Sequence, residues 1–209
     1  MTAARTEGVR AEAPRGRPRS VEVDRAIAEA ALDVLADQGI AGFSVEAVAQ
    51  RAGVGKATVY RRYAGRDEVL GAALDYLRDD LPAAPPLGSA RERLELVLES
   101  IRTPMMATRS GRIMAQVISA SAQHPDFLAS FHERVLGPRR KQLVAILQEG
   151  VDEGWVDPHL DLDAVATLLV GPMIFVKMWH GTPMADTPTA QVLDLALRGI
   201  GVKNPATCS

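Results

Sequence analysis

Apolar residues recur at three- and four-residue intervals along most of the chain, which is the spacing of an α-helix with one buried face. Ile27, Val34 and Leu35 follow this spacing in the first such segment, and Gly39 supplies a helix stop. Ser44 is a favourable N-cap for a second helix. The first eighty residues therefore predict four helices, at about 21–39, 44–53, 56–63 and 67–80.

A proline-rich segment interrupts this pattern between residues 81 and 88, and proline cannot continue a helix because it lacks the backbone N–H. Beyond it the pattern predicts five longer helices, at about 89–102, 110–123, 125–149, 162–179 and 189–200. Pro138 is expected to kink or split the third of these. No segment shows a convincing strand pattern, so the sequence predicts an all-α protein of about nine helices.

The same pattern predicts the organisation of the chain. An N-terminal domain with a three-helix helix-turn-helix precedes a larger helical C-terminal domain, and both are flanked by segments without periodicity. The predicted parts are a disordered basic arm (1–19), the helix-turn-helix domain (20–81), a Pro-rich linker (82–88), the C-terminal domain (89–201) and a flexible tail (202–209).

Composition narrows the class of protein. Hydrophobic residues make up 47% of the chain and aromatic residues only 4%, which favours helices. Cys208 is the single cysteine, so a disulfide framework is excluded and a reducing, cytoplasmic location is expected. The first twenty residues are polar and arginine-rich, unlike a signal peptide. The longest apolar run, 164–176, is shorter than the roughly 20 residues that span a bilayer, so no membrane partner is expected.

The formal net charge of −2 does not by itself suggest a nucleic-acid partner. The positive charge is concentrated, however, in two places: the N-terminal arm and the stretch from Arg51 to Arg66. DNA binding depends on a local basic surface and not on the total charge. The sequence is therefore compatible with a DNA-binding protein.

The stretch from Ser44 to Tyr63 predicts two short helices joined by a tight turn at Gly53. Such a turn favours a left-handed backbone, which glycine adopts without steric cost. The second helix exposes side chains that donate hydrogen bonds to phosphates and base edges, namely Lys56, Thr58, Tyr60, Arg61 and Arg62. Short helix pairs also occur in proteins that do not bind DNA, and basic residues on a surface helix are usually only solvated. These residues alone leave both interpretations open.

Residues 21–80 resemble the DNA-binding domain of the tetracycline-repressor (TetR) family. The resemblance rests on Ala49-Gln-Arg-Ala-Gly-Val54, Thr58-Val-Tyr-Arg-Arg-Tyr63 and Gly65-Arg-Asp-Glu-Val-Leu70, in the family's order and spacing. The remaining helices are similar, less specifically, to the effector-binding and dimerisation domains of that family. The resemblance implies a homodimeric transcriptional regulator, a repressor, that binds an inverted-repeat operator and responds to a small, largely apolar effector.

The resemblance also implies roles for individual residues. Lys56, Ala57 and Thr58 would face base edges in the major groove, with Arg61 as a further base reader. Backbone phosphates would be contacted by Ser44, Tyr60, Arg62 and Arg66, and a minor groove by Arg17 and Arg19. Gly55 departs from the family pattern, which often has a serine there, so a capping hydroxyl is lost.

The second half of the chain offers two sets of candidates. A dimer interface is expected at Leu168, Leu169, Phe175, Val192, Leu195 and Leu197, although packing within one subunit explains the same residues equally well. An effector pocket is expected at Met105, Met106, Met114, Ile118, Phe127, Phe131, Trp155, Met178 and Trp179, each of which also suits a hydrophobic core. The candidates for orienting polar contacts are Gln116, Ser119, His132 and Lys177.

An enzyme is the rival hypothesis for the helical second half. The sequence contains no Gly-rich phosphate loop and no Gly-x-Ser-x-Gly elbow. Its four histidines lack the spacing of a recognised metal site. We therefore expect no catalytic residues, no cofactor and no metal, and the partners to be double-stranded operator DNA, an effector and a second copy of the chain.

Overall fold

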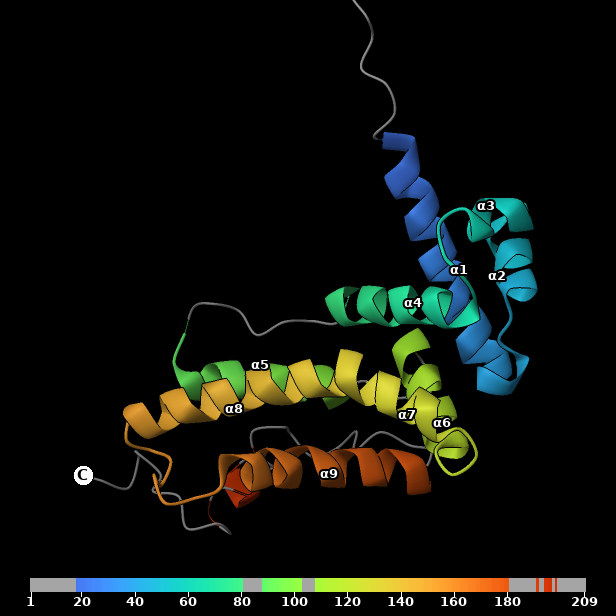
Figure 1. Ribbon diagram of the computed structural model, residues 1–209. Helices are drawn as coiled ribbons and strands as arrows, with labels where there is room; N and C mark the ends of the chain where they lie inside the picture. Colours follow the sequence, from blue (N-terminus) through green and yellow to red (C-terminus); the bar gives the residue numbers. More distant parts are fainter. Residues whose placement is uncertain are drawn as a thin grey trace, which may run out of the picture.

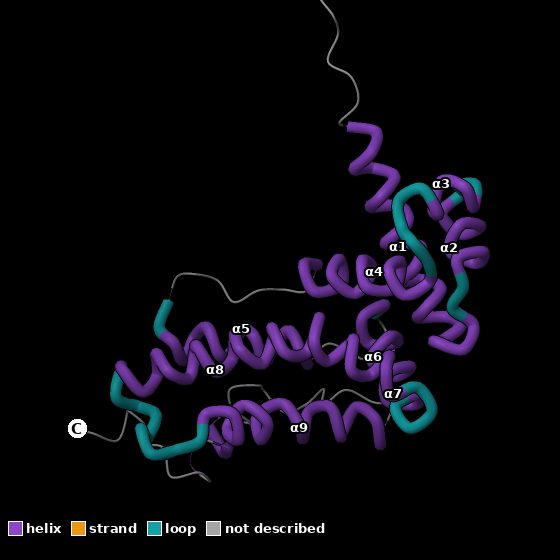
Figure 2. The backbone as a smooth tube through the Cα atoms, viewed as in Figure 1, coloured by secondary structure: helices purple, strands orange, loops and turns teal. Residues whose placement is uncertain are grey.

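The computed structural model in Figure 1 describes residues 18–80, 88–102, 108–180, 191, 194–196 and 198. Within these ranges it contains nine α-helices with definable bounds, one π-helical turn and no strand (Figure 2). The isolated positions after residue 190 are also helical, in the segment where the sequence predicts the last helix. The prediction of an all-α fold is confirmed.

The N-terminal helices are α1 (Pro18–Gly42), α2 (Val45–Ala52), α3 (Lys56–Tyr60) and α4 (Arg66–Asp80). The predicted interruption at Gly39 is confirmed, because its backbone is non-helical with φ 66°, but helical structure resumes beyond this kink and α1 ends at Gly42. The predicted end of the third helix was wrong. Helix α3 ends at Tyr60 and not at Tyr63, because the backbone N–H groups of residues 62 and 63 both donate to the carbonyl of Val59 and tighten the chain into a turn toward α4.

The C-terminal helices are α5 (Ala90–Arg102), α6 (Arg109–Ala120), α7 (Pro125–Phe131), α8 (Gly137–Asp152) and α9 (Leu162–His180), with the π-helical turn η2 (His132–Leu136) between α7 and α8. The expected split at Pro138 is confirmed. The N–H of Gly137 donates to the carbonyl of His132, five residues earlier. The helical turn just before the proline therefore contains one residue more than an α-helical turn. Thr108 caps α6, which begins and ends slightly earlier than predicted.

Two hydrophobic clusters hold the helices together. The first cluster contains residues from α1, α2, α3, α4, α6, α7 and η2. It includes the fully buried Leu35, Leu74, Ile113 and Phe131. The second joins α5, α8 and α9 around Leu94, Leu98, Leu147 and Leu169. The division between the two clusters therefore does not coincide with residues 82–88, where the sequence predicts a linker. Helices α6 and α7 follow that segment but pack into the core of the N-terminal helices.

This packing sets the arrangement seen in Figure 1. Helix α1 contacts α2, α4 and α6, whereas α5, α8 and α9 contact one another. Helices α2 and α3 lie at one end of the molecule, on the side of α1 away from α9. The described helices include none that is both long and apolar enough to cross a membrane.

Candidate nucleic-acid interface

The α2–turn–α3 unit owes its geometry to two residues identified from the sequence. The Ser44 side chain accepts a hydrogen bond from the N–H of Ala47 at 3.1 Å and so caps α2. Gly53 ends that helix in the left-handed conformation, with φ 67° and ψ 27°. The N–H of Val54 then donates to the carbonyl of Ala49 at 3.0 Å, which closes the turn. Both predictions are confirmed.

Helix α3 is anchored by one face and exposes the other. Val59 is fully buried and Val54 packs against the same core. Lys56, Ala57, Tyr60 and Arg61 are exposed, whereas Thr58 and Arg62 are half-buried. The side chains predicted to face DNA are thus accessible on one short helix and the turn after it. Gly55 precedes α3 without a side-chain cap, as its missing hydroxyl predicts.

Most of the predicted DNA-contacting side chains that the structure describes have partners within the protein. The ammonium group of Lys56 lies 3.0 Å from the Glu46 carboxylate, and this hydrogen bond holds the pKa of Glu46 below its ordinary value. Arg62 forms a 2.6 Å ion pair with Asp24 of α1. Arg61 donates a weak 3.3 Å hydrogen bond to the Thr58 hydroxyl. Sequence reasoning missed Asp24 and gave Glu46 no contact, because both partners are set by how the helices pack.

Arg66, at the start of α4, has a structural role that the sequence did not reveal. Its guanidinium donates to the backbone carbonyls of Ile40 at 2.8 Å and Phe43 at 3.0 Å, and lies over the Phe43 ring at 5.7 Å. These bonds satisfy carbonyls where α1 ends and tie that end to α4. The side chain remains 43% exposed. Tyr63 packs against the first hydrophobic cluster, and burial raises the pKa of its hydroxyl.

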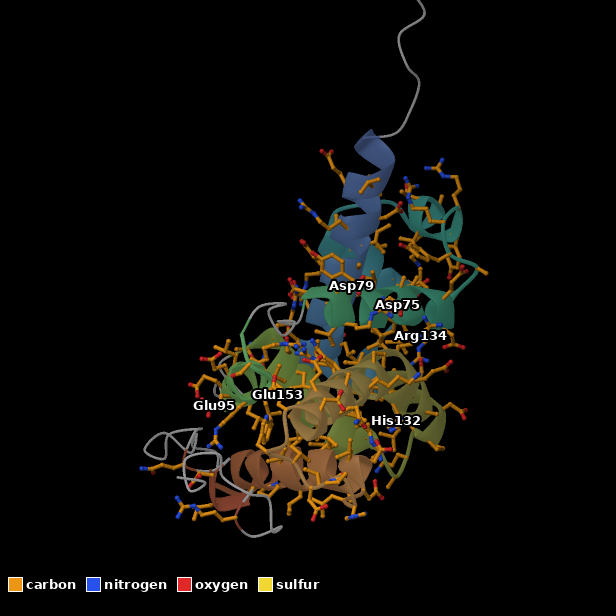
Figure 3. All side chains as sticks on the ribbon, turned by 90° about the vertical axis from the view of Figure 1, so that its left-hand side faces the viewer. Asp75, Asp79, Glu95, His132, Arg134 and Glu153 are labelled. Carbon is orange, nitrogen blue, oxygen red and sulfur yellow. The ribbon has the colours of Figure 1, made fainter. Side chains whose placement is uncertain are left out.

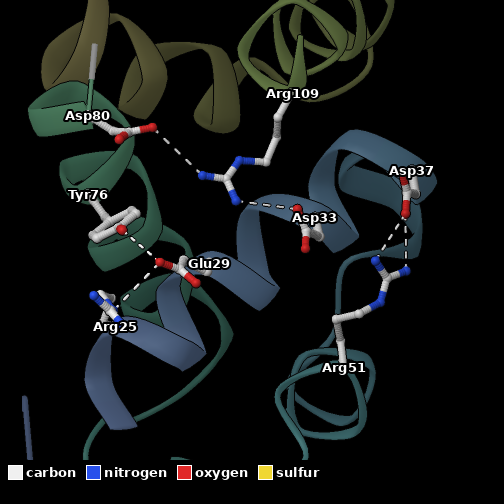
Figure 4. Close-up of polar contacts among 8 residues, drawn as sticks. All are labelled: Arg25, Glu29, Asp33, Asp37, Arg51, Tyr76, Asp80 and Arg109. Carbon is white, nitrogen blue, oxygen red and sulfur yellow. Dashed lines mark hydrogen bonds and ion pairs between the residues drawn. The ribbon is translucent and has the colours of Figure 1, made fainter. Parts of the chain in front are cut away.

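Helix α1 carries a row of charged residues at four-residue spacing that bonds to each neighbouring element (Figure 4). Glu29 accepts from the Tyr76 hydroxyl of α4 at 2.8 Å, and Asp37 accepts two hydrogen bonds of 3.1 Å from Arg51 of α2. Asp33 pairs with Arg109, the first residue of α6, at 3.4 Å. Arg109 also reaches Asp80 at the end of α4, at 3.8 Å. Helix α1 therefore connects the helix-turn-helix to both α4 and α6.

The comparisons with known proteins agree with this geometry. Residues 27–73 match the family described as "Bacterial regulatory proteins, tetR family", and residues 84–196, more than half of the chain, match "Tetracyclin repressor-like, C-terminal domain". The chain belongs to the TetR family. It is therefore a helix-turn-helix DNA-binding transcriptional regulator, and the family is not an enzymatic one.

Individual relatives of this TetR-family regulator match over most of its length. It is 26% identical over 190 residues to the uncharacterised HTH-type transcriptional regulator YdeS of Bacillus subtilis, covering 90% of this chain and 95% of that one. An uncharacterised HTH-type regulator of Mycobacterium tuberculosis is 30% identical over 168 residues, covering 79% and 82%. Among solved structures, FadR of Bacillus subtilis in complex with stearoyl-CoA has a TM-score of 0.63 at 20% identity, covering 84% of this chain and 98% of that one.

Among the predicted effector-pocket residues that the structure describes, Trp155 lies in a different cluster from Met114, Phe127 and Phe131. Phe127 and Phe131 are buried in the first cluster, with their rings 6.3 Å apart, whereas Trp155 is buried in the second. Met114 and Ile118 of α6 are half-buried. Met105 and Met106 lie outside the described residues, as do the side chains of Met178 and Trp179. Of the polar candidates, Gln116 donates to the carbonyl of Ala36 at 3.5 Å, which ties α6 to α1.

The predicted dimer residues are also divided. Leu168 of α9 and Leu195 are exposed, by 45% and 67%. Leu169 is buried in the second cluster, so it belongs to the core of its own protomer. Val192, Leu197 and the side chain of Phe175 lie outside the described residues, as do Arg17 and the side chain of Arg19 among the predicted DNA contacts.

Proposed function

We propose that this TetR-family regulator is a homodimeric repressor that binds an inverted-repeat operator and is released by a small, largely apolar effector. The observation that carries the proposal is the α2–turn–α3 unit, which is fixed by its cap, turn and core and presents hydrogen-bond donors on its outer face. Two such units in a dimer would insert α3 into successive major grooves, roughly 34–36 Å apart.

Within that arrangement we assign Lys56, Thr58 and Arg61 to base edges, because they are hydrogen-bond donors on α3 and at its end that remain exposed or half-buried. Phosphate contacts are assigned to Ser44, Tyr60, Arg62 and Arg66, and minor-groove contacts to Arg17 and Arg19. Arg62 would exchange its bond to Asp24 for a phosphate. Arg66 would keep its two carbonyl bonds and use its remaining N–H groups, because its guanidinium is still partly exposed.

The outer face of α9 supports the dimer. Ala164, Thr167, Leu168 and Gly171 are exposed and follow one another at helical spacing on one side of α9. Small residues around one leucine allow a second helix to approach closely, and a second copy of this face would bury the leucine. Leu168→Glu is expected to shift the protein to a monomer in sedimentation velocity, while Thr167→Ser stays dimeric. A dimeric Leu168→Glu variant would place the interface elsewhere.

The contacts between the two halves support effector control. Arg134 of η2 pairs with Asp75 of α4 at 2.6 Å, and a Cβ on Gly71 would lie only 3.1 Å from this guanidinium. Figure 3 labels both members of the pair. Together with Arg109, this pair links α4 to the C-terminal helices. A ligand that binds one arrangement of α4 better than the other would change the spacing of the two α3 helices. We place the effector beside the half-buried Met114 and Ile118 of α6. The first probes are a free long-chain fatty acid, which matches a small apolar effector, and stearoyl-CoA, the ligand in the FadR complex.

Operator selection from random DNA, followed by fluorescence anisotropy, tests the proposed function. The double variant Lys56→Ala/Arg62→Ala is expected to bind the selected operator at least ~100-fold more weakly, from two lost contacts. The control, Arg140→Ala/Lys141→Ala on α8, removes the same charge and should bind within about threefold of wild type. Equal binding by both double variants would refute the assignment of α3 as the reading helix.

A further inference from the structure

Glu46 is the single acidic residue between Ser44 and Tyr63, a stretch that contains four basic residues. It lies in the first turn of α2, and its carboxylate is 3.0 Å from the ammonium group of Lys56, the first residue of α3. Both side chains are more than half exposed. An acidic group thus lies beside the start of the helix assigned to base reading, where phosphates repel it.

Stability explains only part of the position of this pair, because the first turn of α2 favours an acidic residue at Glu46 but does not require a lysine beside it. An ion pair between two exposed side chains contributes little to folding. Helix α2 already has its Ser44 cap and its buried Val45 and Val48, and α3 has the buried Val59. Asp24, the other acidic partner on this side, comes from α1 and pairs with the half-buried Arg62. Glu46 is therefore the carboxylate that the α2–turn–α3 unit itself presents beside its hydrogen-bond donors.

The pair also has a definite chemical complement in DNA. It places a hydrogen-bond donor and an acceptor 3.0 Å apart. In the major groove a C·G base pair presents the N4 amino donor of cytosine next to the O6 and N7 acceptors of guanine. Carboxylates accept from cytosine N4 and lysine donates to guanine, so one pair of side chains can satisfy one base pair.

We propose that Glu46 is a specificity-determining residue that reads a C·G base pair in each half-site together with Lys56. The proposal rests on the proposed role of α3 in operator binding. On non-specific DNA the carboxylate stays paired with Lys56 and repels phosphates. The pair therefore weakens binding to every DNA site that lacks the matching base pair. Glu46 thus raises the ratio of specific to non-specific affinity.

The test is operator selection on wild type, Glu46→Gln, Glu46→Ala and Lys56→Ala, with Asp37→Asn as the control. Asp37 pairs with Arg51 at 3.1 Å and similar exposure, so its substitution removes the same charge from the same domain. Both Glu46 variants should lose preference for C·G at one operator position by at least about fivefold. Lys56→Ala should lose preference at that same position, and Asp37→Asn should keep every preference.

Unchanged base preferences in the Glu46 variants, or a change at a different position from Lys56→Ala, would overturn the proposal. If wild type selects no inverted repeat, it is the proposed function that fails; if it selects one and only the Glu46 result is negative, the failure belongs to this inference alone.

Non-specific affinity gives a second measurement that does not require an operator. On random-sequence duplex, Glu46→Gln should bind several-fold more tightly than wild type, and its salt slope should steepen by about one because Lys56 is free to contact a phosphate. Asp37→Asn should leave the slope unchanged. Equal increases in affinity for operator and random DNA in Glu46→Gln would show that Glu46 acts only through its charge, and would overturn the proposal.

Discussion

Replacing Gly53 by alanine tests the account of the turn between α2 and α3. The residue has φ 67°, and a Cβ built on it would meet no atom within 4 Å. Any cost of the substitution is therefore conformational and not steric. A left-handed conformation costs an L-residue about 1–2 kcal/mol. Alanine also lowers the conformational entropy of the unfolded chain, which offsets about 0.4–1 kcal/mol of this cost. We expect Gly53→Ala to lower the free energy of unfolding by about 1 kcal/mol.

Gly55, two residues later, provides a matched control. A Cβ there would also meet no atom within 4 Å, but the backbone has φ −71° and ψ 144°, which alanine adopts freely. Alanine is a poorer N-cap than glycine, but it also lowers the conformational entropy of the unfolded chain, and these two effects nearly cancel. The free energy of unfolding of Gly55→Ala should therefore lie within about 0.5 kcal/mol of wild type.

Urea unfolding of the full chain, followed by circular dichroism, measures both variants. The protein concentration must be held constant because association shifts apparent stability. Gly53→Asn should be less destabilised than Gly53→Ala, since asparagine tolerates the left-handed region. Equal effects of alanine at the two glycines, or a neutral Gly53→Ala, would refute the reasoning.

Three further predictions concern the rest of the fold. Gly150→Ala should cost about 2 kcal/mol of unfolding free energy in the same assay, because its Cβ would lie 2.6 Å from the buried Trp155 ring. A double-mutant cycle on Arg134 and Asp75 should give a coupling of only about 0.5 kcal/mol, because both side chains are partly solvated. Tyr76→Phe should cost about 1 kcal/mol below pH 10, and the difference from wild type should shrink at higher pH.

The sign of the last prediction follows from the pKa of Tyr76, which its hydrogen bond to a carboxylate of α1 raises above 10.0. A group whose pKa is higher in the folded state stabilises the protein fully at pH values below its unfolded-state pKa. This contribution is lost as the pH rises through its folded-state pKa. A constant difference across pH 8–12 would contradict it. For Gly150, the control is Gly65→Ala, whose Cβ would meet no atom within 4 Å and whose backbone φ is not positive. Gly65→Ala should be neutral or stabilising, and a matching loss there would remove the steric explanation.

The features predicted best from the sequence depend on local backbone chemistry. The Ser44 cap, the left-handed Gly53 and the split before Pro138 each follow from one residue and its neighbours. The ends of helices were predicted less well. Helix α3 stops at Tyr60 because the chain must turn into α4, which is a requirement of packing that hydrophobic spacing does not contain.

The features that the sequence did not reveal depend on segments far apart in the chain. Lys56–Glu46 joins α3 to α2 and Arg62–Asp24 joins the turn after α3 to α1, and neither spacing is a helical one. The same limit explains the effector candidates. Methionine and aromatic residues suit a pocket and a core equally well, and only the packing shows that Phe131 and Trp155 lie in separate clusters.

The central claim is that the exposed side of α3 enters the major groove, and photo-crosslinking tests it most directly. A photoreactive amino acid at Thr58 is expected to crosslink to bases of the selected operator, whereas the same amino acid at the exposed Lys141 of α8 should give no crosslink. Crosslinks at Lys141 with none at Thr58, in a protein that still binds the operator, would contradict the account.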